Sequence, residues 1–501
     1  MNDRRQQQVM RCVENQPSRV AAPMRLRRRV ALAVSCAAFV LGGCSFIPHQ
    51  PRPDAPVATS FPDGERNDDP ALPRAIDTGW RDFFRDPRLQ ALIEAALSNN
   101  RDLRTAALRI EESRALYNIQ QADLLPNVGV IAGATRARSL IPQTAASPRS
   151  VVGSTYQVGL SLTSFELDFF GRVRALNASA LASYLATTEA QQSAQISLIA
   201  AVAQANLTER SYAEQLELAR STEKTRQSAY ALAKQRFDVG ASSALDLRLA
   251  ESIVLQARVA AVTLARQRAQ AFNALTLLVG QPLTELPPSQ ALSSENLVSG
   301  IPAGLPSDLL TNRPDIRAAE QRLRAANANI GAARAAFFPR ISLTAALGAA
   351  STSLSGLFDS GSGTWSFGPQ LLLPIFDAGR NQANLTLAQV RTSLAVTDYE
   401  KTIQVAFREV ADALAARGTL EEQVVAQQQF LEAQADRLRL AELRRQNGVA
   451  SSLDVLDAQR EVFNAQQSLV QTRLQRLTNA VDLYRSLGGG INERTIPQAA
   501  R

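Results

Sequence analysis

The residues that most often carry enzyme chemistry are scarce in this chain. Its only histidine is His49, and its three cysteines are Cys12, Cys36 and Cys44. Because this histidine lies in a proline-rich linker, we expect no nucleophilic catalysis by a His–Ser or His–Cys pair, and most zinc sites would lack ligands. Carboxylates are present, as in any chain of this size, but nothing in their pattern requires an enzyme. We therefore predict no catalytic site, no metal and no bound cofactor.

Two matching turns place carboxylates at the start of predicted helices. Gly240-Ala241-Ser242-Ser243-Ala244-Leu245-Asp246 recurs as Gly448-Val449-Ala450-Ser451-Ser452-Leu453-Asp454. Serine followed three residues later by an acid is a capping box, and the glycine suits the left-handed end of the preceding helix. Asp246 and Asp454 can therefore be purely structural. Asp457 lies on nearly the same helix face as Asp454, and capping does not require it.

Long helices must position these turns. Residues 172–237 contain no glycine and no proline, which predicts a rod of about 100 Å. The matching stretch 381–446 is interrupted only by Gly418. A wall of helices would be completed by return helices over 243–279 and 452–487 and by shorter helices over 101–124 and 315–337. The last helix carries a heptad seam typical of coiled-coil packing, formed by Leu456, Phe463, Val470, Leu477 and Tyr484.

Four segments alternate with period two, which predicts strands with one apolar face. Their apolar positions are Val128, Val130, Ala132 and Ala134; Tyr156, Val158, Leu160 and Leu162; Ile341, Leu343, Ala345 and Leu347; and Trp365, Phe367, Leu371 and Leu373. Polar residues 139–152 and 351–362 are predicted loops. Four strands cannot close a barrel. Either several chains close it together, or the sheet belongs to a soluble sandwich.

The body of the chain is an internal repeat. Asp102 and Asp315 are 213 positions apart, whereas Gly240 and Gly448 are 208 apart, so the length difference falls in the strand region. We predict a fold that is mainly α with a small β part. The predicted segments are a signal peptide (1–43), a proline-rich tether (44–77), a first repeat (78–280), a linker (281–305), a second repeat (306–487) and a tail (488–501).

The leader accounts for most of the positive charge. Residues 1–43 hold eight arginines against two acids, in a chain whose formal net charge is +8, so we expect no nucleic-acid partner. An apolar run follows Arg29 and ends at Leu41-Gly42-Gly43-Cys44, which resembles the lipobox of bacterial lipoproteins. An ordinary signal peptide with an incidental cysteine is the alternative. The resemblance implies lipid attachment at Cys44, and Ser45 after it implies the outer membrane.

The doubled turns, the run Asn312-Arg313-Pro314-Asp315-Ile316 and Gly379-Arg380 together resemble the TolC-like outer-membrane efflux family. The resemblance covers roughly residues 77–487 and is closest to the lipid-anchored branch that serves RND-type multidrug pumps. It implies a homotrimer whose strands form one β-barrel in the outer membrane, continued by a long periplasmic α-helical tube. It also implies a passive conduit for drugs or other small molecules, with a periplasmic adaptor, an inner-membrane RND-type pump and outer-membrane lipid as partners.

The resemblance also assigns the turns a place. Gly240, Ser243, Gly448 and Ser451 would shape the helix tips, and Asp246, Asp454 and Asp457 would line the periplasmic entrance. The first repeat has Leu249 where Asp457 stands, so only the second repeat supplies the second acidic ring. Ala450 occupies the position of a basic latch residue in some members, and Arg444 and Arg445 are possible substitutes.

Two other functions remain open at this point. One is a protein-secretion conduit of the same fold, which the lipid anchor weakly disfavours. The other is a trimeric coiled-coil surface or structural lipoprotein, which explains the rods and the anchor but not two separate hairpins.

Replacement of Cys44 tests the anchor. Cys44→Ala should abolish incorporation of labelled palmitate, because the acylated thiol is gone, while the body of the protein still folds. Substitution of Cys36 by Ala, inside the leader, should leave labelling of the mature protein unchanged. Label retained on the Cys44→Ala protein would exclude lipid attachment at this residue.

Overall fold

The computed structural model describes residues 45–62, 73–141, 149–284, 286–288, 291–292, 301–302, 304 and 306–495. The predicted signal peptide and Cys44 lie outside these residues. The chain forms two compact units. The strand unit contains Val128–Arg172 and Phe338–Pro374, and the helical unit contains Ile47–Asn127, Val173–Phe337 and the chain from Ile375 onward. Each predicted repeat contributes to both units, and the boundaries of the repeats stay a prediction.

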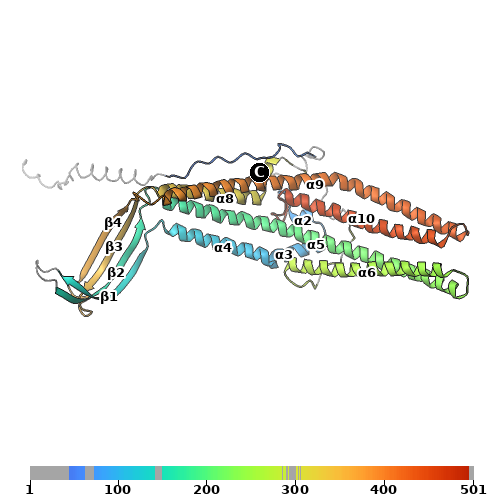
Figure 1. The fold of residues 1–501 in the computed structure, drawn as a ribbon, viewed down its shortest axis with the longest axis horizontal. Helices are drawn as coiled ribbons and strands as arrows, with labels where there is room; N and C mark the ends of the chain where they lie inside the picture. Colours follow the sequence, from blue (N-terminus) through green and yellow to red (C-terminus); the bar gives the residue numbers. More distant parts are fainter. Residues whose placement is uncertain are drawn as a thin grey trace, which may run out of the picture. The chain divides into compact units, whose positions relative to one another are not determined.

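The strand unit is one antiparallel sheet in the order β1-β2-β3-β4 (Figure 1). Its strands are β1 (Val128–Ile141), β2 (Arg149–Glu166), β3 (Arg340–Ser351) and β4 (Gly363–Leu372). The prediction of a loop over 139–152 was wrong at both ends, because the β1–β2 ladder continues to the pair Ile141 and Arg149. Backbone pairing tolerates the polar composition that suggested a loop. The predicted loop at 351–362 does separate β3 from β4.

One face of this sheet is apolar and exposed. Val130 pairs with Leu160, Leu160 with Leu347, and Leu347 with Trp365, so these four side chains form a row across one face. Their exposed fractions are 74%, 51%, 65% and 78%. An apolar surface this continuous indicates a contact with lipid or with another protein surface.

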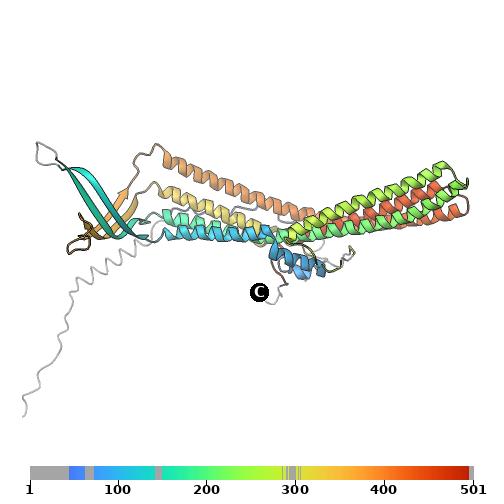
Figure 2. The same ribbon diagram turned by 90° about the horizontal axis from the view of Figure 1, so that it is seen from below.

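The helical unit is built on two very long helices, α5 (Arg172–Asp238) and α9 (Arg380–Gln446), each of 67 residues. At 1.5 Å per residue each is about 100 Å long, as predicted. Within this unit α8 and α10 lie in succession along α9, and α4 and α6 along α5 (Figures 1 and 2). The remaining helices are α2 (Trp80–Phe83), α3 (Pro87–Asn99), α4 (Arg101–Ala122), α6 (Ala244–Val279), α7 (Pro306–Asn312), α8 (Pro314–Ala335) and α10 (Ser452–Ser486).

The predicted wall of helices is therefore confirmed within this unit. Among the described helices, none combines the length and the apolar character that a membrane crossing demands. The heptad seam of α10 is buried from Phe463 through Val470 and Leu477 to Tyr484. Leu453, which precedes the seam, is 55% exposed, whereas Val455 and Ala458 at the same end of α10 are buried.

The largest core of the helical unit joins the segment that precedes α3 to the last part of α10 and the residues after it. The ring of Phe83 stacks on that of Tyr484 with 4.0 Å between centroids, and Tyr484 Oη donates to the carbonyl of Thr78 at 2.7 Å. Gly489 lies so close to the Tyr484 ring that an added Cβ would stand 2.3 Å from it. Residues beyond the last helix are thus held against the segment that precedes α3.

The proline-rich segment is not a free tether over its described part. It has no helix, as predicted, but it packs on the helical unit. Arg52 donates to Tyr399 Oη at 2.9 Å and forms an ion pair with Glu320 at 3.2 Å, and Phe61 stacks on Phe407. Proline prevents regular pairing but leaves side chains free to bind, so the segment follows α8 and α9.

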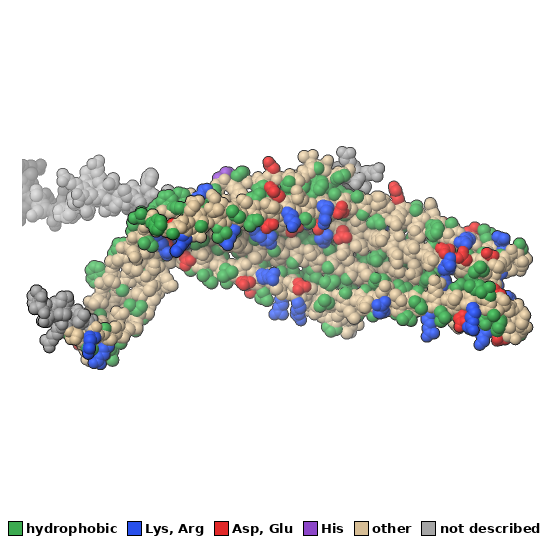
Figure 3. Space-filling model, viewed as in Figure 1, with side chains coloured by type: hydrophobic (Ala, Val, Ile, Leu, Met, Phe, Trp, Pro, Cys, Tyr) green, Lys and Arg blue, Asp and Glu red, His purple; other side chains and the backbone are tan. Residues whose placement is uncertain are grey.

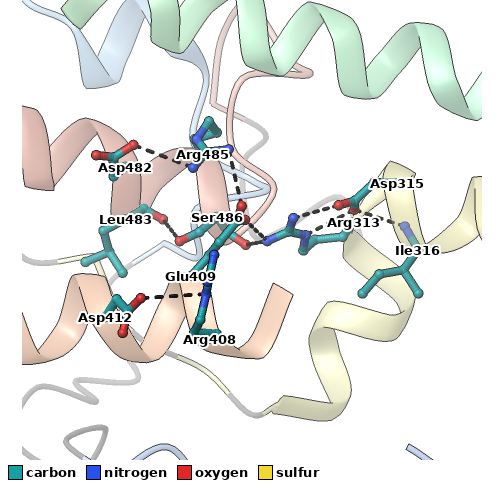
Figure 4. A network of polar contacts seen from close by, with 10 residues as sticks. All are labelled: Arg313, Asp315, Ile316, Arg408, Glu409, Asp412, Asp482, Leu483, Arg485 and Ser486. Carbon is teal, nitrogen blue, oxygen red and sulfur yellow. Dashed lines mark hydrogen bonds and ion pairs between the residues drawn. The ribbon is translucent and has the colours of Figure 1, made fainter. Parts of the chain in front are cut away.

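Arg313 connects three helices near the start of α8 (Figure 4). It pairs with Asp315 at 2.6 Å and with Glu409 on α9 at 2.9 Å, and it donates to the carbonyl of Ser486 at the end of α10 at 3.1 Å. Burial by itself lowers the pKa of Arg313. The hydrogen bonds and negative charges of Asp315 and Glu409 outweigh burial, so the pKa of Arg313 is raised. Its positive charge therefore stabilises the junction of α8, α9 and α10.

A second buried network joins α3 to α5. Arg210 pairs with Asp86 at 2.8 Å, and these side chains are only 3% and 2% exposed. Asp86 also caps α3 by accepting from the backbone N–H of Arg88. Burial lowers the pKa of Arg210, and the charge of Asp86 opposes that shift. Arg210 also donates to the carbonyl of Ala291 at 2.6 Å, which fastens part of the inter-repeat linker.

Removal of one partner from this pair should destabilise the fold strongly. Arg210→Met leaves the Asp86 charge buried without its partner, which should cost about 3–5 kcal/mol. Thermal unfolding followed by circular dichroism measures the loss. Arg324→Met, which breaks an exposed pair with Glu320, should change stability by less than about 1 kcal/mol. Equal effects of the two substitutions would contradict the role assigned to Arg210.

Candidate functional site at the helix turns

The turn between α5 and α6 has the predicted capping box. Asp246 N donates to Ser243 Oγ at 3.1 Å, and Ser243 N donates to the Asp246 carboxylate at 3.4 Å. Gly240 has a φ of +71°, a left-handed conformation that residues with a Cβ rarely adopt. The Ala241 N–H bonds the carbonyl of Arg236, which closes the end of α5.

The turn between α9 and α10 repeats this geometry. Gly448 has a φ of +75°, and the Ser451 N–H donates to the Asp454 carboxylate at 2.9 Å. The side-chain bond from Ser451 is the largest cause that lowers the pKa of Asp454, followed by the Ser451 backbone N–H and the charge of Arg444. Since the folded pKa is lowered, the cap contributes stability above the usual aspartate pKa of about 3.9. That contribution is lost as pH falls through the lower, folded value.

Asp457 takes no part in the cap. One carboxylate oxygen pairs with Arg437 on α9 at 2.7 Å, and the other pairs with Arg460, one turn further along α10, at 2.6 Å. Its side chain is 33% exposed. The negative charge predicted to face a passage is therefore matched by two guanidinium groups of the same chain.

Sequence reasoning missed Arg437. It named Arg444 and Arg445 as possible latch residues, but neither forms an ion pair with Asp457 among the described residues. The sequence held a signal for this pairing, because Arg437 and Asp457 are equally far from Asn447 in the turn. In an antiparallel helix hairpin, residues equally far from the turn lie at the same level, so their pairing follows from the spacing.

The two turns come together around a small cavity of about 150 Å³. Residues of α5, α6, α9 and α10 line it, including Asp246, Arg445 and Val455. Apolar side chains make up much of the lining, but three buried polar atoms in it have no hydrogen-bond partner among the described residues: Ser242 Oγ, Arg445 Nε and Gln459 Oε1. A cavity of this size with three such atoms suits ordered water between the two hairpins.

The first repeat lacks the charge arrangement of the second. Leu249 stands where Asp457 does in the second repeat, and the nearby Arg248 pairs with Glu251 at 2.6 Å. Asp246 and Asp454 therefore correspond as caps, whereas Asp457 with its two arginines belongs to the second hairpin alone. Within the described part of the chain, no group of histidine, cysteine and acidic residues could hold a metal ion.

Comparisons with known proteins agree on one family. The family described as outer membrane efflux protein matches residues 92–281 and 305–489. The probable efflux pump outer membrane protein TtgC of Pseudomonas putida is 46% identical over 468 residues, which is 93% of this chain and 96% of that protein. Outer membrane protein OprJ of Pseudomonas aeruginosa is 47% identical over 470 residues, covering 93% and 97%.

Solved structures extend the likeness to the fold. The open state of the MtrE outer membrane channel of Neisseria gonorrhoeae has a TM-score of 0.82 and 41% identity, and covers 91% of this chain and 100% of that one. A membrane protein from Pseudomonas aeruginosa has a TM-score of 0.82 and 46% identity, with 89% and 100% covered. This chain therefore belongs to the outer membrane efflux protein family and works in the outer membrane as the channel subunit of an efflux pump.

Proposed function

We propose that the protein is a passive, trimeric conduit of a tripartite pump, in which a periplasmic adaptor and an inner-membrane RND-type pump deliver small toxic molecules. The single observation that carries this is the likeness over nearly the whole chain to efflux channel proteins. The curated relatives include a toluene efflux protein and an antibiotic efflux protein of Pseudomonas putida. Apolar solvents and antibiotics are accordingly the proposed cargo.

Unsatisfied surfaces within each unit support the trimer. β1 and β4 each have one neighbour in the sheet, so each leaves a row of backbone groups unpaired. Pairing of β4 with β1 of a second copy would satisfy these groups, and three copies would close one barrel. Helix α4 has no buried residue, although Leu108, Leu116 and Ile119 are on its surface at 55%, 58% and 66% exposure. A second copy is the proposed cover for this helix.

The helix turns would form the periplasmic entrance of such a trimer. Three copies would bring Asp454, Asp457 and their arginines around one axis. No catalytic group is required, because a conduit needs only a passage and a constriction. Lipid attachment at Cys44 stays part of the proposal, and it would hold the chain at the outer membrane.

The trimer has a direct test. Light scattering of the purified protein in detergent, corrected for bound detergent, should give three times the mass of one chain. The same preparation should form channels in planar bilayers, because the closed sheet would enclose water. A stable monomer that conducts like the purified protein would contradict the proposal.

The entrance has a second test. Asp457→Asn removes the acid that Arg437 and Arg460 share, so three copies lose three negative charges and channel selectivity should move from cations toward anions. We expect the permeability ratio to change by at least about twofold, with weaker block by divalent cations. Asp454→Asn should act similarly and also weaken the cap, because the amide has no charge to accept the Ser451 hydrogen bonds.

Asp436→Asn is the matched control. Asp436 precedes Arg437, is 57% exposed and pairs with Arg439 along α9. Asp436→Asn removes the same charge as Asp457→Asn, but its ion pair lies along α9 and does not reach α10. Selectivity should therefore stay unchanged. If the Asp454→Asn and Asp457→Asn double variant keeps its selectivity and block, these residues do not line the passage.

A further inference from the structure

The apolar face of the β1–β2 hairpin ends in two arginines. Residues that pair directly in the ladder lie on the same face of the sheet. This face holds the pairs Val128 and Leu162, Val130 and Leu160, Ala132 and Val158, and Ala134 and Tyr156. The next two positions on this face of β1 are Arg136 and Arg138. Arg136 pairs with Ser154 and Arg138 with Val152. The face therefore changes from aliphatic to aromatic to cationic toward the turn.

These two arginines have no acid to neutralise them. Both side chains are exposed, and neither forms an ion pair with any described residue. The only acidic residue in β1 or β2 is Glu166, at the opposite end of β2, where it pairs with Arg172 and Arg340 at 2.7 Å each. Lys and Arg side chains gather at the turn end of this unit (Figure 3). The positive charge there is therefore open to an external anion.

The spacing suits a membrane surface. Arg136 and Arg138 follow Val128 by eight and ten residues, or about 27 and 33 Å along an extended strand. At the tilt of about 40° usual for membrane strands, these become heights of about 20 and 25 Å, close to the top of an apolar band about 25 Å tall. Tyr156 pairs with Ala134, one step before Arg136 on the same face, and so lies at a height of about 15 Å, inside the apolar band.

We propose that Arg136 and Arg138 bind the phosphate groups of lipid headgroups in the leaflet beside the β1–β2 turn. This rests on the proposed function, in which the apolar face of the sheet contacts membrane. Guanidinium groups recognise phosphate through paired N–H donors and a full charge. Two residues apart on one strand, they lie about 7 Å apart, close enough to engage a headgroup that has two phosphates.

Lipid titration tests the proposal. The full-length protein in mild detergent is titrated with diphosphoryl lipid A, and bound lipid is counted by native mass spectrometry. Arg136→Gln with Arg138→Gln should weaken binding by about tenfold or more, and monophosphoryl lipid A should bind the unchanged protein less tightly. Phosphatidylcholine should bind both proteins equally. Arg136→Lys with Arg138→Lys should recover most of the affinity, because the charge is kept.

Arg258→Gln with Arg266→Gln is the matched control, since it removes two exposed arginines from α6 and should leave lipid A binding unchanged. Equal binding by the Arg136 and Arg138 glutamine variant and the unchanged protein would overturn the proposal, and so would an equal loss in the control. Trimer mass and conductance are measured on the same preparations. If those fail in the unchanged protein, the proposed function fails. If they hold while lipid binding is unaffected by the variant, only this inference fails.

Discussion

Backbone groups at the edges of the sheet constrain the strand unit more than any side chain does. A four-stranded antiparallel sheet satisfies its inner N–H and C=O groups, but β1 and β4 each keep one unpaired edge. In water such edges invite pairing with other chains, and in lipid each unpaired group costs several kcal/mol. The exposed apolar row from Val130 to Trp365 adds a second reason for a partner or a membrane. The family to which the chain belongs works in the outer membrane, which supplies the lipid.

The helical unit also needs neighbours, and its own return helices supply them. A helix of 67 residues gains little from its own backbone and depends on lateral packing. Return helices supply that packing, and the capping boxes at Ser243 and Ser451 set where each return helix begins. The aspartates of the turns are thus structural whatever else they do. Asp457 takes no part in a cap, and its ion pairs with Arg460 on the same helix and with Arg437 on α9 join α10 to α9.

Several acidic residues of this protein form ion pairs with arginines of the same unit. Asp457 lies between Arg437 and Arg460, Glu166 between Arg172 and Arg340, and Asp86 against Arg210. Each acid is held by arginine, whose planar guanidinium makes directed bonds with carboxylates. Arg136 and Arg138 have no acid near them in their own hairpin, in which the one acidic residue of the two strands, Glu166, lies at the opposite end.

Much of the fold could be predicted from the sequence alone, because its signals are local. Periodicity and the absence of glycine and proline placed the long helices within a residue or two, and serine-to-aspartate spacing placed both caps. The tertiary structure alone decided the docking of Arg52 on Tyr399 and the burial of Asp86 against Arg210. Both contacts join segments more than a hundred residues apart. Such contacts depend on how helices pack side by side, and no local period encodes which side chains then meet.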